Sequence, residues 1–213
     1  MKKKYKLTDE SISFNGKTLY RIEAVIDFSN NFSDVKKGQK GGFIESEYNL
    51  SHEGDSWVYD NAKVFDNAEV FGNAKVFGNA KVFVNAKVFD DAKVFGNAEV
   101  FGNANVSGNA CVIENSFVKG NAKINGHAMI SGNAIVCGNA NICADEDYIV
   151  FKNWWSSNRY FTWTKSNNMW KVGCFYGSGK ELIKNAYKDS EKSGREYERV
   201  VKYVESILAD EKK

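Results

Sequence analysis

A six-residue phrase repeats through the middle of the chain and constrains its fold more than any other feature. Written as Asn-Ala-x-Val-x-Gly, it places Val or Ile at every sixth position from Val58 to Ile142, fifteen times without interruption. Two positions earlier stands Ala in thirteen repeats and Ser in two, Ser56 and Ser116. One position before that, Asn occurs in twelve repeats. So short and constant a period predicts a stack of near-identical structural units.

The order of residues within each repeat indicates how the unit is built. In an extended stretch such as "AKVF", successive side chains point to opposite faces, so Ala and Val share one face and Lys and Phe the other. The Gly-Asn or Asp-Asn that follows tolerates positive φ and predicts a corner. One repeat cannot bury its Val alone, whereas stacked coils create a continuous column. The absence of Pro from all 213 residues suits such unbroken backbone ladders.

The Asn-Ala-x-Val pattern resembles the hexapeptide repeat of left-handed parallel β-helix proteins. The resemblance implies that three hexapeptides make one triangular turn of eighteen residues, so that fifteen repeats make about five coils. It also implies the left-handed crossover, which is an exception to the usual hand of parallel connections. One feature differs from the family pattern. The position just after the aliphatic residue is usually small or acidic there, and here it is aromatic, with Gly one residue later.

The segments on either side of the repeats differ from them in composition. In residues 1–49, the pair Asn15-Gly16 between alternating runs predicts a β-hairpin. Ile44 and Leu50 are expected to form an irregular first coil before the repeats of residues 50–144. We expect the hairpin and this coil to cap the open edge of the β-helix, because an uncovered edge invites aggregation.

Residues 145–213 are predicted to form a small C-terminal α+β domain. The stretches "YIVFKN", "RYFTWTK" and "MWKVGCFYG" are rich in strand-forming residues, and the apolar residues after them recur at helical spacing. We expect this domain to dock on the β-helix. The order of all these parts, over nearly the full chain, resembles uncharacterised phage and prophage proteins that share this repeat and a C-terminal α+β domain. That resemblance implies a fold and carries no activity with it.

Charge and cysteine content exclude several functional classes. The net charge of +2, from 29 basic and 27 acidic residues, predicts no strong field for nucleic acid. The four cysteines show no Cys-x-x-Cys spacing, so we expect no metal site and no cofactor. The basic N-terminus has no apolar run behind it, and no stretch is apolar enough to cross a bilayer. We therefore expect a cytoplasmic protein with reduced thiols and no membrane association. The resemblance to phage and prophage proteins implies that this cytoplasm is that of a bacterial host.

Outward-facing aromatic and basic residues form the first candidate binding surface. With eighteen residues per turn, Tyr59, Phe77 and Phe95 stack along one face, and similar Phe ladders follow the other two. Lys75 and Lys93 form a companion column. An apolar stripe of this length is typical of a contact surface, although the rings can also simply stack on one another under the lysine stems. Glu residues interrupt the lysine columns, so nucleic acid is compatible with this surface but not favoured.

Tryptophan in the C-terminal segment marks the second candidate surface. Four of the five Trp residues fall within "NWWSSNRYFTWTKSNNMW", at Trp154, Trp155, Trp163 and Trp170, with Arg159 between them. Trp and Arg are the commonest interface anchors. The alternative is that these rings build the core of the small domain. We expect Trp154, Trp155, Arg159 and Trp170 to lie near the rim of a groove.

Three functions are compatible with these features. The first is a phage-type, non-enzymatic binding protein that sequesters or blocks a host component, either a host protein or a small phosphorylated ligand. The second is a structural or oligomerising β-helix protein, and a homo-oligomer is expected in either case. The third is a divergent hexapeptide acyltransferase, because such enzymes use a His general base. His127 occupies a corner position where Asn is usual, and no loop interrupts the repeats, so we expect no catalytic residue.

Overall fold

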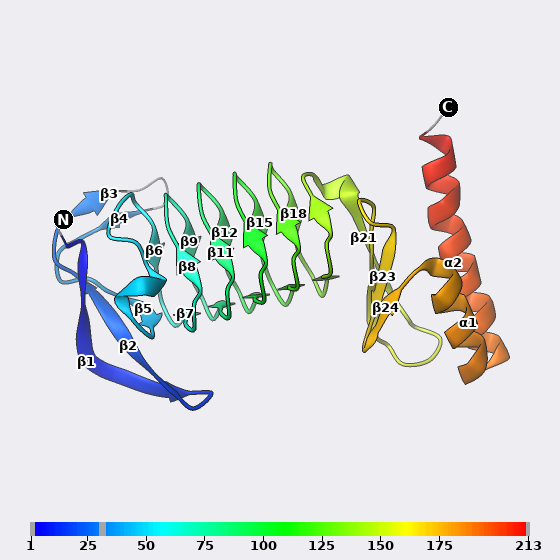
Figure 1. The fold of residues 1–213 in the computed structure, drawn as a ribbon, viewed down its shortest axis with the longest axis horizontal. Coiled ribbons are helices and arrows are strands. Elements are labelled where there is room, and N and C mark those ends of the chain that lie inside the picture. The colour runs from blue at the N-terminus through cyan, green and yellow to red at the C-terminus, as the bar shows by residue number, and fades with distance from the viewer. Residues whose placement is uncertain (1–2, 30–32, 212–213) are drawn as a thin grey trace. The chain divides into compact units, whose positions relative to one another are not determined.

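The computed structural model describes residues 3–29 and 33–211, and the chain divides into two compact units. The first unit ends at Asp147 and the second begins at Tyr148 (Figure 1). The predicted boundary between residues 144 and 145 lies close to this division. The N-terminal hairpin, predicted as a separate segment, belongs to the same compact unit as the repeats.

The repeats form a parallel β-helix in which each hexapeptide contributes one strand of two residues. Its coils are stacked in register along the first unit (Figure 1). The fifteen strands are β6 (Trp57–Val58), β7 (Lys63–Val64), β8 (Glu69–Val70), β9 (Lys75–Val76), β10 (Lys81–Val82), β11 (Lys87–Val88), β12 (Lys93–Val94), β13 (Glu99–Val100), β14 (Asn105–Val106), β15 (Cys111–Val112), β16 (Phe117–Val118), β17 (Lys123–Ile124), β18 (Met129–Ile130), β19 (Ile135–Val136) and β20 (Asn141–Ile142).

The strands belong to three parallel sheets, one for each side of the coil. Every third strand pairs, so that Val94 of β12 lies opposite Val76 of β9 and Val112 of β15. The other two sheets run β20-β17-β14-β11-β8 and β7-β10-β13-β16-β19. An eighteen-residue turn was predicted, and these registers confirm it.

An irregular first coil precedes the repeats, as predicted, and brings the stack to about six turns instead of five. β5 (Lys40–Ile44) pairs in parallel with β7, with Ile44 opposite Val64, and Leu50 forms a bridge to Val70. A short 3₁₀ helix, η1 (Glu47–Asn49), lies between them. Both pairs are twenty residues apart instead of eighteen, because two extra residues lie between Leu50 and the first repeat.

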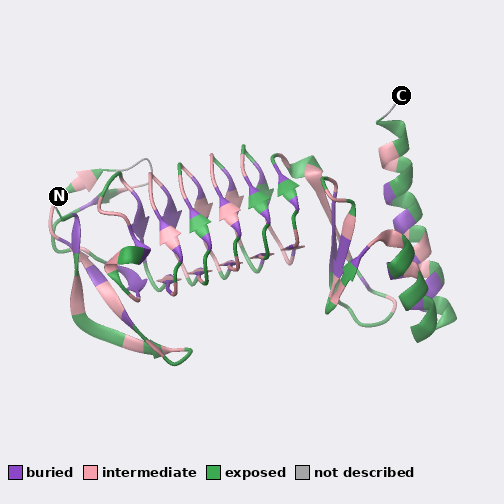
Figure 2. Ribbon diagram, viewed as in Figure 1, coloured by how far each residue is buried: buried purple, intermediate pink, exposed green. Residues whose placement is uncertain are grey.

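The core of the β-helix contains the residues that the alternation predicted. All fifteen Val and Ile residues have no exposed surface, and neither do the Ala or Ser residues two positions before them. Buried positions recur on each short strand along the stack (Figure 2). The aromatic residues after the aliphatic positions lie outside this column. Phe95, for example, is half-buried while Val94 is fully buried.

Corner geometry explains the glycine of the repeat. The residue after the aromatic position has positive φ at successive corners, for example Gly78 at 68°, Gly96 at 72° and Gly102 at 75°. The coils also approach closely there, because a Cβ on Gly96 would lie 2.9 Å from the backbone N of Glu114. Glycine therefore relieves both a conformational and a steric constraint.

Acidic residues replace glycine at some corners and gain a hydrogen bond in return. The carboxylate of Asp60 accepts from the backbone N–H of Gly78 one turn later (2.9 Å), and Glu114 accepts likewise from Gly132 (2.6 Å). Asp66 accepts from the N–H of Val84 at 3.1 Å. Val84 itself is the exception among the corners, since a β-branched residue there has a φ of 63° and a side chain that is 38% exposed.

The two ends of the β-helix carry opposite unsatisfied backbone groups. The N–H groups of alternate residues donate to carbonyls of the following coil, as in Trp57 N–H to Ala74 O at 3.0 Å, whereas corner N–H groups such as that of Ala62 bond within their own coil. The first coil is therefore left with unpaired carbonyls. Lys4 Nζ donates to two of them, those of Gly54 (3.0 Å) and Ser56 (2.8 Å), and Tyr5 OH donates to that of Leu50 (2.7 Å).

At the last coil the corresponding N–H groups lack acceptors, because no coil follows to supply carbonyls. Acidic residues of η2 (Asp145–Asp147) accept from it. Asp145 accepts from the N–H of Met129 and Asp147 from that of Cys143, both at 2.7 Å.

The predicted hairpin is confirmed and covers the first edge of one sheet. β1 (Tyr5–Phe14) and β2 (Lys17–Ala24) are antiparallel, and both turn residues, Asn15 and Gly16, have positive φ. β2 pairs with β5, so the hairpin continues the sheet beyond the first coil. A further two-stranded ribbon consists of β3 (Phe28–Ser29) and β4 (Asp34–Val35).

The C-terminal unit is an antiparallel sheet with two helices, as predicted. Its strands, in spatial order, are β21 (Tyr148–Lys152), β22 (Tyr160–Thr164), β23 (Met169–Val172) and β24 (Phe175–Gly177). The helices are α1 (Gly179–Asp189) and α2 (Glu191–Asp210), and Ser190 between them caps both. Neither of these helices, nor any other in the described residues, is long and apolar enough to cross a membrane.

We predict that replacing Val94 by Asp unfolds the β-helix, whereas replacing Phe95 by Asp does not. A carboxylate at position 94 would be buried and unpaired in the aliphatic column, which costs about 4 kcal/mol or more. At position 95 the loss is the ring stack and part of its burial, about 1–3 kcal/mol. Circular dichroism and urea unfolding of the two variants measure the difference. A Val94→Asp protein as stable as the wild type would contradict the observed register.

A second prediction concerns the strained corner at Val84. Replacing Val84 by Gly is expected to raise the free energy of unfolding by about 1 kcal/mol. The strain free energy that Gly removes from the left-handed conformation is larger than the free energy lost because the unfolded chain becomes more flexible. Little buried surface is lost. The matched control is Gly102→Val in the same corner column, one coil later. It should destabilise the protein, because a Cβ at position 102 would lie 2.9 Å from Gly120 N. Thermal unfolding of both variants checks the two signs.

Candidate binding pocket in the C-terminal unit

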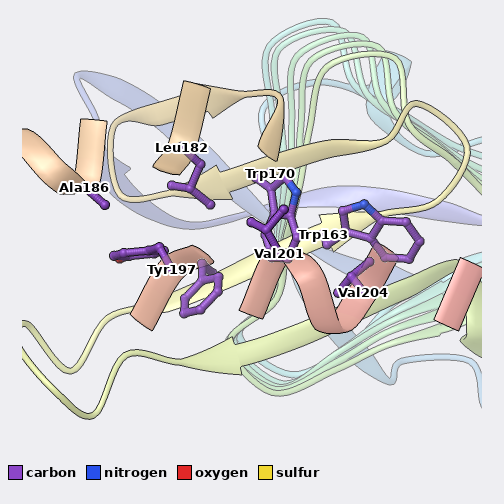
Figure 3. Close-up of a cluster of buried hydrophobic side chains, with 8 residues drawn as sticks. Trp163, Trp170, Leu182, Ala186, Tyr197, Val201 and Val204 are labelled. Carbon is purple, nitrogen blue, oxygen red and sulfur yellow. The ribbon is translucent and has the colours of Figure 1, made fainter. Parts of the chain in front are cut away.

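Two of the tryptophans predicted to bind a partner are core residues instead. Trp163 and Trp170 are 2% and 1% exposed, and they pack with Leu182 of α1 and with Tyr197 and Val201 of α2 (Figure 3). They are direct cross-strand neighbours on β22 and β23. The expectation that they lie on an exposed surface is therefore wrong. Both nevertheless line a smaller cavity of about 150 Å³ with Ser178 and Val204, and their part in binding stays a prediction. Their rings fill the single core between sheet and helices.

The other predicted residues of this unit lie together on the connection between β21 and β22. Trp154 is 73% exposed, the largest exposed fraction among the large hydrophobic residues described. Trp155 is half-buried and packs edge-on against Tyr197, with ring centroids 5.3 Å apart. The rings of Trp154 and Trp155 also meet edge to face at 6.1 Å. Arg159, at the end of the connection, is exposed.

The candidates on the β-helix occupy one sheet face, but only part of each is accessible. Phe77 and Phe95 are half-buried and stack with centroids 4.5 Å apart and planes 7° apart. Lys75 is only 1% exposed, and its ammonium donates to the carbonyl of Asn73. Burial lowers its pKa. Lys75 is thus not an exposed binding residue, whereas Lys93 in the next coil is half exposed. The rings mainly contact one another.

A cavity of about 320 Å³ opens beside the Trp154 connection, within the C-terminal unit. Four parts of the unit line it: the β21–β22 connection, the turn between β23 and β24, α1 and α2. Its volume lies at the lower end of the range of small-molecule pockets. The lining residues are Asn153, Ser156, Ser157, Arg159, Val172, Cys174, Phe175, Leu182, Asn185, Ala186, Asp189, Ser193 and Tyr197.

Asn153 holds the wall of this cavity in place. Its backbone N–H donates to the carbonyl of Arg159 (2.7 Å), which closes the connection on itself. Its side-chain oxygen accepts from the N–H and hydroxyl of Ser156, both at 3.0 Å. Its side-chain nitrogen donates to the hydroxyl of Tyr197 on α2 at 3.0 Å. With 1% exposure, this single amide ties the connection to the helix layer.

Opposite charges face the cavity. Arg159 and Asp189 both line it, and neither forms an ion pair or side-chain hydrogen bond with another described residue. The guanidinium of Arg159 lies above Gly173, where φ is 52° and an added Cβ would be 3.1 Å from Nη1. Burial raises the pKa of Tyr197; the hydrogen bond from Asn153 opposes this, Asp189 raises the pKa further and Arg159 lowers it.

The most important residues of the cavity were missed at the sequence level. The helical spacing of apolar residues after the strands predicted that this segment packs, but not that the hydroxyl of Tyr197 lines a cavity. Asn153 looked like an ordinary residue at a strand end, and Asp189 like the acidic residue before a helix start. The Asn-Trp-Trp-Ser-Ser stretch, polar residues around two adjacent Trp, was the one signal that pointed to this region.

The two histidines are far from this cavity in the sequence and lie in the first unit. His127 is exposed at a corner, where its backbone N–H donates to Cys143 O. His52 stacks on Tyr5 with centroids 4.2 Å apart, and its Nδ1 accepts from the N–H of Lys4 at 3.2 Å. Within residues 3–29 and 33–211, no three His, Cys, Asp or Glu side chains are placed to hold a metal ion.

Comparison with known protein families finds no matching family model, and comparison with curated proteins finds no match. The chemistry of the cavity therefore has to be inferred from its own residues. These are one cation, one anion and several hydroxyl and amide groups above an apolar floor of Val172, Phe175 and Leu182.

We predict that replacing Asn153 by Ala destabilises the C-terminal unit by about 2–3 kcal/mol. The change removes three side-chain hydrogen bonds of a buried amide and leaves the N–H of Ser156 without its acceptor. Urea unfolding followed by tryptophan fluorescence measures the loss, since four of the five Trp lie in this unit. Asn185→Ala is the matched control. Asn185 lines the same cavity but is exposed, and a change above about 0.5 kcal/mol is not expected there.

Proposed function

We propose that the protein is a non-enzymatic binding protein of phage type that sequesters or blocks a host component in the bacterial cytoplasm. In this proposal the C-terminal unit recognises the partner, a host protein, and the β-helix is a rigid scaffold. The phage assignment, the hexapeptide-repeat family and the left-handed coil are adopted from the sequence resemblance. The single observation that carries the proposal is the exposure of Trp154.

An indole that is 73% exposed is unusual unless it has a partner. Trp154 is also oriented by Trp155, whose own ring is held against Tyr197 and Phe161. A ring supported in this way loses little conformational entropy on binding, which favours affinity. Trp residues of this kind are the commonest hot spots of protein interfaces. These features support Trp154 as the anchor of a protein–protein contact.

The positions of the histidines support a role without catalysis. His52 packs on Tyr5 in the N-terminal cap, where its Nδ1 accepts a hydrogen bond from the N–H of Lys4 and its Nε2 lies 3.6 Å from the carboxylate of Glu47, so both ring nitrogens already face protein groups. His127 stands in a corner column between Asn109, one coil earlier, and Cys143 near the end of the next. A general base needs a group that orients it and a site for the substrate beside it. The regular course of β6 to β20 includes no inserted loop that would enclose a substrate beside His127.

A structural role through assembly is the second candidate, and one observation favours it. The outward positions of the late coils are apolar at Cys111, Phe117 and Met129, where earlier coils carry Lys or Glu. Met129 is 44% exposed. Sizing of the purified protein separates the two proposals. A small, defined homo-oligomer or a monomer fits binding, and an open-ended assembly that grows with concentration fits a structural role.

The binding proposal is tested by recovering partners from a bacterial lysate with the full chain as bait. We expect Trp154→Ala to reduce recovery of the wild-type partner at least tenfold while the variant keeps the wild-type melting temperature. Tyr48→Ala is the matched control, because Tyr48 is 60% exposed but belongs to the first unit. If Trp154→Ala recovers the same partner in the same amount as the wild type, the C-terminal unit does not recognise it.

A further inference from the structure

The cavity of the C-terminal unit is lined by two charged side chains that form no ion pair with another described residue. Arg159 enters from the β21–β22 connection, and Asp189 from the last residue of α1. Both act on the same phenol, that of Tyr197, and in opposite senses. They are nevertheless not paired with each other, so a cavity of about 320 Å³ is lined by an unpaired cation and an unpaired anion.

Hydrogen-bond donors accompany the cation. Tyr197 accepts from Asn153, and its own hydroxyl proton is donated to no other described side chain, which leaves that proton for a ligand. The second amide proton of Asn153 has no acceptor among the described residues either. A guanidinium, a hydroxyl and an amide N–H that line one cavity are suitable partners for a carboxylate, because charge-assisted hydrogen bonds to Arg are strong and directional.

Asp189 excludes a ligand that is only an anion. A phosphate or dicarboxylate near Arg159 would also be exposed to the carboxylate of Asp189 in the same small space, and like charges disfavour such binding. A ligand that also carries an ammonium group converts this repulsion into attraction. Val172, Phe175 and Leu182 contribute apolar surface to the same cavity. The cavity therefore matches a molecule with an anion, a cation and a short apolar part.

We propose that this cavity binds a small zwitterion of the amino-acid or short-peptide class. The ligand's carboxylate lies on Arg159 and the Tyr197 hydroxyl, its ammonium lies on Asp189, and its side chain lies against Phe175. This site is separate from the Trp154 contact proposed above and does not depend on it. Either can be lost without the other, because Trp154 does not line the cavity.

Cys174 provides a direct reporter of occupancy. It lines the cavity and is an exposed free thiol, so a bound ligand should slow its alkylation by iodoacetamide. Cys143 is a second exposed free thiol, in the first unit, and serves as the internal control. Peptide mass spectrometry measures both rates in the same sample of the full-length protein.

The probes are norleucine, the dipeptide glycylnorleucine, and two analogues that each lack one charge, hexanoate and pentylamine. We expect norleucine or the dipeptide to slow alkylation of Cys174 and to leave Cys143 unchanged. Both analogues should need at least tenfold higher concentrations for the same protection. If norleucine protects at a lower concentration than the dipeptide, the ligand is a free amino acid. If the dipeptide protects at the lower concentration, the ligand is the end of a peptide. Inorganic phosphate should protect no better than hexanoate.

Two charge-removing variants complete the test. In Arg159→Gln, norleucine should protect no better than pentylamine. In Asp189→Asn, it should protect no better than hexanoate. Arg195→Gln, which removes an exposed Arg of α2 outside the cavity, should behave as the wild type, and so should Trp154→Ala. Circular dichroism confirms that each variant is folded. Equal protection by the zwitterion and its analogues, tighter binding of phosphate, or no protection by any zwitterion at millimolar concentration would overturn the proposal.

Discussion

The direction of the backbone hydrogen bonds in the parallel coil is the constraint on which the rest of the structure depends. N–H groups of alternate residues in one coil donate to carbonyls of the next, so the first coil presents carbonyls that have no preceding coil and the last coil presents N–H groups that have no following one. Donors from Lys4 and Tyr5 meet the first need, and carboxylates of Asp145 and Asp147 meet the second. Burial in this cap lowers the pKa of Lys4 to about 8. The cap at the first coil therefore supplies hydrogen-bond donors, and the cap at the last coil supplies acceptors.

The same hydrogen-bond ladder stacks each side chain against the equivalent side chain of the next coil, eighteen residues away. Asn on Asn forms a column of amide hydrogen bonds, as in Asn67, Asn85 and Asn103, and Phe on Phe forms a stack. Lys stacks on Lys at Lys63 and Lys81 and at Lys75 and Lys93, where like charges repel, and acidic residues elsewhere in the columns limit this repulsion. Glu99 follows Lys81 in its column, with an ion pair of 2.7 Å. The Glu residues that interrupt the lysine columns thus reduce repulsion between stacked lysines and stabilise the β-helix.

The C-terminal unit follows no such period, and its candidate site depends on single contacts. Asn153 joins the β21–β22 connection to α2 through one hydrogen bond to Tyr197, across 44 residues of sequence. That contact shapes the cavity between Arg159 and Asp189 and holds the segment that presents Trp154. A repetitive scaffold cannot easily produce one unique pocket, because each of its coils offers the same surface. The non-repeating unit is where both proposed binding sites lie.

The sequence by itself determined the β-helix, its period, the identity of its core and the position of the hairpin. These follow from local rules: alternation decides which face is buried, and positive φ decides where the chain turns. It could not determine that Trp163, Trp170 and Lys75 are buried while Trp154 is exposed. The cavity, the unpaired charges that face it and the cap formed by Lys4 were likewise decided only by the tertiary structure. Each depends on contacts between residues far apart in the chain, and no local pattern encodes which polar groups such contacts will bring together.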